Sequence, residues 1–97
     1  MPMVKTDDLG EYAMAKTVRL DVRETPPYQR HPLIFENWES LEIGDTLELV
    51  NDHDPRPLHY QFMMERDGEF EWTSEELGPM EWVAHIKRLA ASKVTTP

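Results

Sequence analysis

The chain has 97 residues, no cysteine, and a formal charge of −9 from nineteen Asp and Glu residues against ten Lys and Arg residues. The absence of cysteine excludes disulfides, thiolate metal sites and persulfide carriage, and it fits a cytoplasmic location. The acidic balance argues against a nucleic-acid partner. Because no apolar run reaches the roughly 18 residues that a membrane span needs, we also expect no membrane partner.

A chain of this length forms one domain at most. Residues 1–15 show no clear period and lack the basic start and apolar centre of a signal peptide, which predicts a flexible leader. Residues 91–97 are predicted to form a tail. The folded domain is therefore expected to span residues 16–90.

The first element that the pattern predicts is a strand over residues 17–23, TVRLDVR, where apolar and polar side chains alternate. A loop stiffened by Pro26 and Pro27 follows. His31-Pro32 then predicts the entrance of a helix, because proline is favoured at the first helical position.

The predicted first helix has an apolar stripe made by Ile34, Trp38 and Leu41, spaced four and three residues apart. Gly44 predicts its end. Residues 45–50, DTLELV, alternate again and predict the second strand.

The loop after the second strand leads into a second helix. Asp54 occupies the expected N-cap position with Pro55 immediately after it. The helix is predicted to run to about Arg66, and its inward side chains are expected to be Leu58 and Phe62, with Tyr60 and Met63 as further candidates.

Two more strands are predicted, over residues 69–74 and 81–89, with the intervening EELGPM as a turn. Alternation places Phe70 and Trp72 on the inward face of the first of these strands. It places Trp82, Ala84 and Ile86 on the inward face of the second. We therefore expect the strand tryptophans in the core rather than in an aromatic pocket, with Val83 and His85 on an open face.

The predicted order is β-α-β-α-β-β, a two-layer α/β sandwich with two helices on one face of a four-stranded mixed sheet. If the first two strands are parallel, their carboxyl ends share one edge of the sheet, where ligands of open α/β sheets usually bind. Both helices are expected to point their N-termini and free N–H groups at this edge. The polar residues that this topology gathers there are Arg23, Arg30, His31, Asn51, Asp52, His53, Asp54, Arg56, His59 and Tyr60.

Three long stretches of the chain resemble a known family: LDVRETPPYQRHPLIFENWESL, GDTLELVNDHDPRPLHYQFMMERDGEFEW and GPMEWVAHI. They resemble the domain of unknown function 2249 over about residues 18–88, and NDHDPRPLHYQ is the most specific piece. The resemblance implies a TusA-like fold and a bacterial or archaeal source. It also implies hemerythrin-like or cupin partners and a link to nitrogen-oxide metabolism.

The resemblance does not imply sulfur-carrier chemistry. TusA-like carriers open their first helix with a Cys-Pro pair, and this chain has His31-Pro32 there, or Thr25-Pro26 in another alignment. The scaffold is similar, but persulfide transfer cannot be carried over without the cysteine.

A metal site is one hypothesis for the edge. His31 and His53, with Asp52 or Asp54, offer imidazole and carboxylate ligands suited to zinc, iron or copper. The competing interpretation is structural: Asp54 caps the second helix, and Asn51 or Asp52 forms an Asx-turn.

Anion binding is another hypothesis, because arginines and helix N-termini together can hold a phosphate, a sulfate or another small oxyanion. The competing interpretation is an internal ion-pair network that locks the two loops, such as Arg23 with Asp52 or Asp54.

An enzyme is the weakest reading. A neighbouring His and Asp can act as a general acid–base pair, but the edge has no evident nucleophile, since Ser40, Ser74 and Ser92 fall outside it. The leading functional prediction is therefore a non-enzymatic accessory or interaction module. A metal-binding or redox accessory domain using His31 and His53 is the first alternative, and an oxyanion binder is the second.

Overall fold

The computed structural model describes residues 15–91, so the predicted leader and tail lie almost wholly outside the described residues. The described elements follow the predicted order β-α-β-α-β-β. They are β1 (Thr17–Asp21), α2 (Pro27–Glu39), β2 (Thr46–Asn51), α3 (Arg56–Glu65), β3 (Phe70–Gly78) and β4 (Glu81–Arg88).

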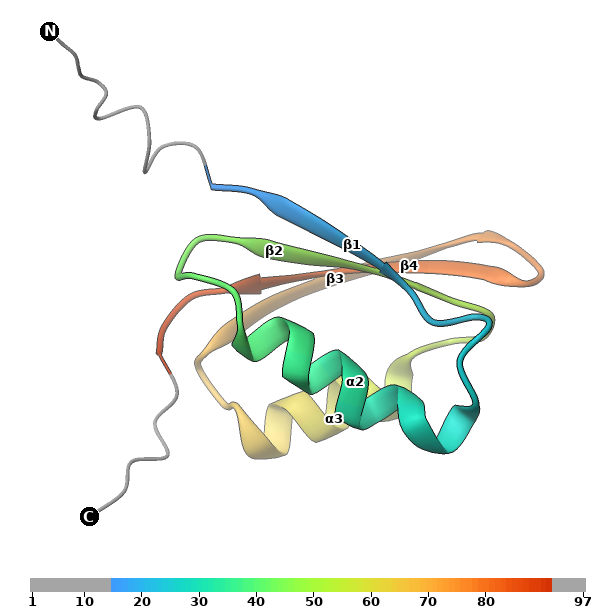
Figure 1. Ribbon diagram of the computed structural model, residues 1–97, viewed down its shortest axis with the longest axis horizontal. Coiled ribbons are helices and arrows are strands. Elements are labelled where there is room, and N and C mark those ends of the chain that lie inside the picture. The colour runs from blue at the N-terminus through green and yellow to red at the C-terminus, as the bar shows by residue number, and fades with distance from the viewer. Residues whose placement is uncertain (1–14, 92–97) are drawn as a thin grey trace, which may run out of the picture.

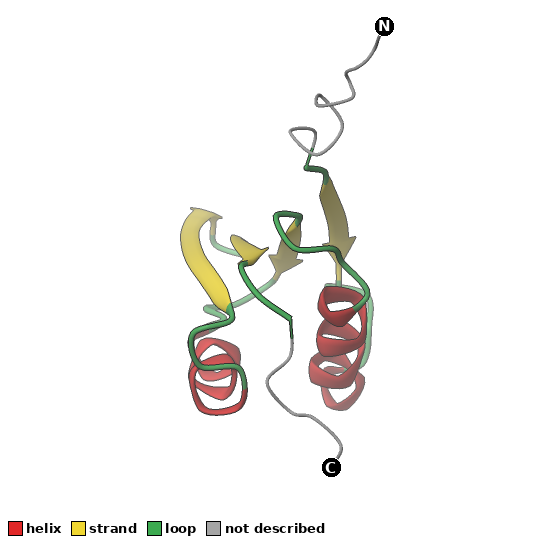
Figure 2. Ribbon diagram, turned by 90° about the vertical axis from the view of Figure 1, so that its left-hand side faces the viewer, coloured by secondary structure: helices red, strands yellow, loops and turns green. Residues whose placement is uncertain are grey.

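The four strands form one mixed sheet in the order β1-β2-β4-β3. β1 runs parallel to β2, while β4 runs antiparallel to both β2 and β3. Both helices lie on one side of this sheet (Figures 1 and 2). The predicted two-layer α/β sandwich is therefore confirmed.

The core lies between the helices and the sheet. Ile34 and Trp38 of α2 and Phe62 of α3 have no exposed surface, as the helical stripes predict. Phe62 stacks with Phe35 at 4.3 Å between ring centroids and meets Trp38 edge-on at 5.2 Å. Full burial of each such side chain contributes about 1.5–3 kcal/mol.

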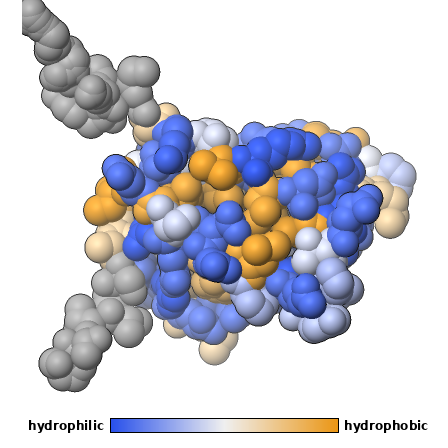
Figure 3. Space-filling view, viewed as in Figure 1, coloured by the Kyte–Doolittle hydropathy of each residue, from blue (hydrophilic) through white to orange (hydrophobic). Residues whose placement is uncertain are grey.

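Coverage of the core is less complete at the β1 edge of the sheet. Val18 and Leu20 are only partly buried, although both pack against the core. Figure 3 shows a largely hydrophilic surface with hydrophobic patches near its centre, between β1 and α2. No helix of the described part of the chain is long and apolar enough to cross a membrane.

The predicted bounds of the first helix are wrong at both ends. α2 begins at Pro27, with Pro26 as its N-cap, and Pro32 lies inside it. Pro26-Pro27 supplies an equally good entrance, and starting there lets Arg30 bond to the carbonyl of Thr25 at 2.8 Å. The helix ends at Glu39, and Gly44, with φ 99°, belongs to the turn before β2.

The predicted start and inward face of the second helix also need correction. The N-cap of α3 is Pro55 rather than Asp54. Asp54 precedes the N-cap, and its Oδ1 still accepts the N–H of Arg56, the first helical residue, at 3.0 Å. Tyr60 is 56% exposed and Met63 is 47% exposed, so only Leu58 and Phe62 face inward as predicted.

The turn predicted between the last two strands is too long. β3 continues to Gly78, and its pairing with β4 shifts register between Glu76 and Gly78. Backbone pairing with β4 overrides the low strand preference of the glutamates. Val83 and His85 were predicted on an open face away from the helices. Val83 is only 9% exposed, so for Val83 this prediction is wrong. His85 is exposed as predicted, and its Nε2 lies 3.3 Å from Glu48 Oε1.

Candidate functional site

Arg30 of α2 joins the two loops at the carboxyl edge of the sheet. Its Nη1 donates to Asn51 Oδ1 and to Asp52 Oδ1, both at 2.9 Å. Its Nε donates to the Thr25 carbonyl at 2.8 Å, and its Nη2 donates to the Arg23 carbonyl at 3.3 Å. Only 8% of the Arg30 side chain is exposed. These contacts of Arg30, Asn51 and Asp52, here called the Arg30 clamp, fix the loop after β1 against the end of β2.

Asp52 is held in its ionised form by the clamp. The Arg30 guanidinium, and after it His53, hold the pKa of the Asp52 carboxyl well below its usual range. His53 Nδ1 lies 2.8 Å from Asp52 Oδ1, while most of the His53 side chain is exposed. His53 is therefore an outer partner of the clamp.

The predicted pairing of Arg23 with Asp52 or Asp54 is wrong. Arg23 Nη2 donates to Asp21 Oδ2 at 2.7 Å, two residues back along the chain. A link between the two loops does exist, but Arg30 makes it from the first turns of α2. The sequence pattern placed the helix start too late for Arg30 to be recognised as this link.

The groups expected to bind an oxyanion are largely occupied. The three edge arginines each hold an aspartate, in the pairs Arg23–Asp21, Arg30–Asp52 and Arg56–Asp54. The helix starts also offer few free donors, because Pro27, Pro55 and Pro57 have no N–H. The edge therefore presents paired charges rather than an open anion site.

The predicted metal ligands are brought together only in part. His31 Nδ1 lies 2.7 Å from Gln61 Oε1 in a contact between the two helices, whereas His53 lies beside Asp52. Across residues 15–91 no group of three or more His, Cys, Asp or Glu side chains is placed to hold a metal ion. The four predicted ligands thus do not form a metal site in this structure.

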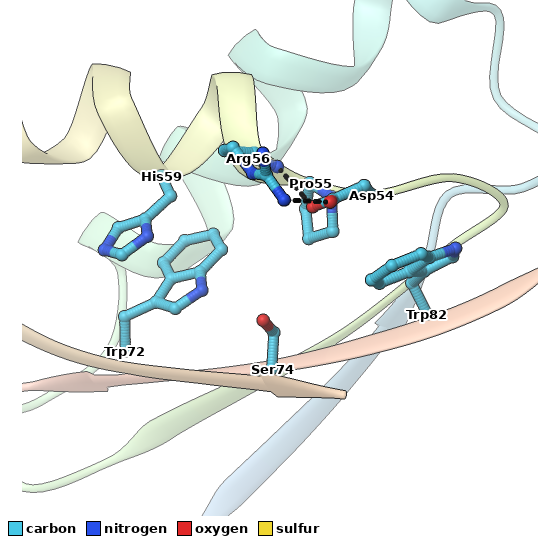
Figure 4. Close-up of a pocket in the computed structure, with 7 residues that line it drawn as sticks. All are labelled: Asp54, Pro55, Arg56, His59, Trp72, Ser74 and Trp82. Carbon is cyan, nitrogen blue, oxygen red and sulfur yellow. Dashed lines mark hydrogen bonds and ion pairs between the residues drawn. The ribbon is translucent and has the colours of Figure 1, made fainter. Parts of the chain in front are cut away.

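A pocket of about 220 Å³ lies beside the clamp, where the start of α3 faces strands β3 and β4 (Figure 4). The loop after β2 and the first turn of α3 form one side, and the two strands form the other. This tryptophan pocket is lined by Asp54, Pro55, Arg56, His59, Trp72, Ser74 and Trp82.

The two tryptophans stand on either side of the Ser74 hydroxyl (Figure 4). Trp72 stacks on His59 with 4.5 Å between centroids and 4° between planes, and it meets Phe62 of the core at 5.8 Å. Trp82 is half-buried and is not part of the core cluster. Trp72 is therefore a rigid wall backed by the core, and Trp82 is a wall that the core does not support.

The polar groups of the pocket carry little net charge. Arg56 Nη2 donates to Asp54 Oδ2 at 3.0 Å, so these two lining residues offset each other. Burial lowers the pKa of the His59 imidazole, because transfer from water disfavours its charged form. The His59 ring that stacks on Trp72 is therefore held toward its neutral form.

Residues 19–88 match the sequence profile of a family described as an uncharacterized conserved protein, DUF2249. The chain belongs to this family. None of the curated proteins and none of the solved structures matches the chain. The resemblance read from the sequence is thus confirmed for the family, while the relation to TusA-like proteins stays a prediction.

In this DUF2249 domain every residue that lines the tryptophan pocket lies within the matched range. The stretch NDHDPRPLHYQ, the most specific part of the resemblance, serves both neighbouring features. Asn51 and Asp52 belong to the clamp, and the part from Asp54 to His59 forms one side of the pocket. Tyr60, predicted at the edge, is exposed and does not line the pocket.

The strand pattern predicts Trp72 and Trp82 in the core rather than in an aromatic pocket, and it places Ser74 outside the edge, yet all three line the pocket. Alternation correctly places Trp72 toward the helices, but it does not say how far along the sheet the helices extend. A usable signal is the position of Trp82 at the start of its strand, where it pairs with the last residue of β2, Asn51. The loop leaving that strand end passes beside Trp82 and does not cover it as a helix would.

Proposed function

We propose that this DUF2249 domain is a small non-enzymatic binding module and that the tryptophan pocket is its working site. The observation that supports this proposal is the incomplete burial of the two strand tryptophans, Trp72 and Trp82. Both line a pocket and are only partly buried, although Trp72 also packs against the core. Ligand pockets are usually concave and lined by aromatic side chains with a few placed polar groups.

The third tryptophan provides an internal comparison. Trp38 has no exposed surface, packs edge-on against Phe62 at 5.2 Å, and lies 5.0 Å from the guanidinium carbon of Arg88. Within residues 15–91, Trp82 has no such aromatic or cationic partner. Trp82 therefore has indole surface available to a ligand.

The size of the pocket limits the ligand. Its volume of about 220 Å³ is below the range of about 300–1,000 Å³ that is usual for sites of drug-sized ligands. A single side chain of a partner protein or a one-ring small molecule is the appropriate size. This fits an accessory domain that works with another protein, and the family resemblance suggests hemerythrin-like or cupin proteins for that role.

Binding is favoured over catalysis by the way the polar groups are connected. In the described residues no hydrogen bond joins Ser74 to His59, and His59 is stacked on Trp72 rather than bonded to a carboxylate. Asp54 is held by Arg56. A nucleophile, a base and an orienting carboxylate are therefore present as residue types but are not linked as catalysis by a serine requires.

The test uses the three indole N–H signals in a two-dimensional NMR spectrum of the nitrogen-15 protein. Benzylammonium, benzyl alcohol and benzoate are titrated separately as one-ring probes of different charge. We expect at least one probe to shift the Trp72 and Trp82 signals saturably and to leave the Trp38 signal in place. If no probe moves Trp72 and Trp82, or if all three indoles shift together, the pocket is not a binding site.

Two variants show whether the probe occupies the pocket. Trp82→Ala removes a wall that the core does not support, so the domain should stay folded while probe binding is lost. Leu77→Ala is the matched control, because Leu77 is exposed on the same hairpin and does not line the pocket. Retained binding in Trp82→Ala would place the probe elsewhere.

A further inference from the structure

Glu76 follows the lining residues Trp72 and Ser74 along β3 and pairs with the lining residue Trp82. Trp72, Ser74 and Glu76 share one face of β3 because successive strand residues point to opposite faces. Glu76 is also the direct cross-strand partner of Trp82, so the register places the two side chains as neighbours on the helix-facing side. The register therefore places a carboxylate residue next to Trp82 that is separate from the Asp54–Arg56 pair.

The surroundings of the pocket have an excess of negative charge. The ends of β1, β2 and β3, the start of β4 and the adjoining loops all lie at this end of the sheet. They carry seven carboxylates against three guanidinium groups, in a chain whose formal charge is −9. The carboxylates are those of Asp21, Glu24, Asp52, Asp54, Glu75, Glu76 and Glu81, and the guanidinium groups are those of Arg23, Arg30 and Arg56. Such a field raises the local concentration of cations.

No arginine or lysine of the described residues makes a cation–π contact with the two tryptophans of the pocket. In the described residues, arginine lies over the rings of Phe35 and Trp38, at 5.4 and 5.0 Å. Neither contact involves Trp72 or Trp82. The negative face of an indole attracts a guanidinium or ammonium group more strongly than the other aromatic rings do.

We propose that the tryptophan pocket binds a positively charged organic group, a guanidinium or an alkylammonium, between Trp72 and Trp82. This inference rests on the proposed function, and it adds the charge and chemical class of the ligand. Indole surface supplies the cation–π contact, Glu76 and the surrounding excess of carboxylates supply the counter-charge, and the Ser74 hydroxyl can accept a hydrogen bond from the cation.

An anionic ligand fits the same site poorly. Arg56 is the positively charged residue that lines the pocket, and its guanidinium already holds Asp54 through a 3.0 Å hydrogen bond. An anion would have to displace that carboxylate and would then face both Asp54 and Glu76 as like charges. Burial also holds His59 toward its neutral form, so His59 adds little attraction for an anion.

The decisive comparison uses two probes of nearly equal shape, N-acetyl-arginine amide and N-acetyl-citrulline amide. Citrulline replaces the guanidinium with a neutral urea group. Affinity is measured from the Trp72 and Trp82 indole shifts, and we expect the arginine compound to bind about tenfold more tightly, as a partly desolvated cation–π contact predicts. Equal affinity for the two compounds, or tighter binding of benzoate than of benzylammonium, would overturn the proposal.

The binding site and the positive charge of its ligand are tested by different outcomes. If benzylammonium, benzyl alcohol and benzoate all leave the Trp72 and Trp82 signals unchanged, the proposed function is wrong. If the neutral or the anionic probe binds best, the binding site stands and the assignment of a cationic ligand is wrong.

Neighbouring glutamates on β3 give a matched pair of variants. Glu76→Gln removes the carboxylate beside Trp82 and should weaken binding of the arginine compound about two- to fivefold, the range for an exposed ion pair. Glu75→Gln makes the same change of charge one residue away, but Glu75 pairs with Val83 on the opposite face and should have less effect. Equal losses of affinity in both variants would mean that Glu76 acts only through the general negative potential, and would contradict a local contact between Glu76 and the ligand.

The cation can come from a free small molecule or from a basic side chain of a partner protein. A short peptide with one arginine flanked by glycines is titrated beside the single-residue probe. Much tighter binding of the peptide supports a protein source, and equal binding supports a small-molecule source. Loss of binding when the arginine of the peptide is replaced by citrulline is expected in either case, and retention would contradict the proposal.

Discussion

The Arg30 clamp and the tryptophan pocket lie next to each other and share the segment 51–59, yet their polar groups are used in opposite ways. In the clamp the buried Arg30 side chain directs donors to Asn51, Asp52 and two backbone carbonyls. In the pocket, indole surface and the Ser74 hydroxyl remain available. A dense set of charged residues thus marks the structural feature, while the less conspicuous tryptophans mark the candidate site.

The loop after β2 is rich in polar residues and proline because it serves both the clamp and the pocket. Its first part must satisfy a buried guanidinium, which requires carbonyl and carboxylate oxygens. Its second part must turn into α3, which Pro55 and Pro57 restrict, while Asp54 orients Arg56. We infer that the clamp sets the position of this loop and so sets the width of the pocket.

The largest expected effect comes from breaking the clamp. Arg30→Ala leaves Asn51 and the partly exposed Asp52 without their main partner, and loss of hydrogen bonds to a charged group typically costs about 1.5–3 kcal/mol. We expect a loss of this order in the free energy of unfolding, measured by urea denaturation. Arg30→Lys should recover only part of it, because an ammonium group cannot reproduce the planar set of donors.

Arg23→Ala is the matched control for the clamp. Arg23 forms an ion pair of similar length with Asp21, but both side chains are more than a third exposed. Exposed pairs contribute about 0–1 kcal/mol, so this variant should unfold almost as the wild type does. Equal losses in Arg23→Ala and Arg30→Ala would show that burial of Arg30 does not distinguish the two pairs.

A smaller effect is expected from acid, acting through Asp52. Its folded-state pKa is lowered, first by Arg30 and then by His53, so the unfolded chain takes up the proton at higher pH than the folded domain does. The stability that Asp52 contributes is therefore full above its unfolded pKa of about 3.9 and declines as the pH falls from there toward the folded value.

Asp52→Asn tests this dependence. The variant lacks the titrating group, so the difference in unfolding free energy between wild type and variant should shrink below about pH 4. Urea denaturation at several pH values measures it. A difference that stays constant from neutral to acidic pH would show that Asp52 does not titrate through the clamp.

Much of the fold follows from local patterns, and the corrections have identifiable causes. Alternation at Val18 and Leu20 and the stripe of Ile34 and Trp38 predict elements that the structure confirms. The start of α2 was misplaced because two proline positions both suit a helix entrance. Tertiary contact decides between them, since Arg30 must lie within the helix to reach Asn51.

The candidate site was only half predictable, for a related reason. Parallel pairing of β1 and β2 correctly gathers Arg30, Asn51 and Asp52 at one edge. Which arginine pairs with which aspartate depends on side-chain geometry that periodicity does not encode. The same holds for Trp82, whose inward direction was predicted but whose lack of cover depends on where α3 begins.

The smallest expected effect concerns His59, the residue of the pocket that stacks on Trp72. Burial lowers its folded-state pKa, so below the unfolded value of about 6.5 the unfolded chain binds the proton first and stability declines. His59→Phe keeps a ring against Trp72 and removes the proton, so stability should vary less between about pH 5 and 7 than in the wild type. Urea denaturation across this range measures the difference, and a wild-type His59 ring titration by NMR should show a midpoint below about 6.5. Parallel pH profiles for the two proteins would mean that His59 is as well solvated in the folded domain as in the unfolded chain, and the pocket would then lack the dry aromatic wall that His59 and Trp72 form.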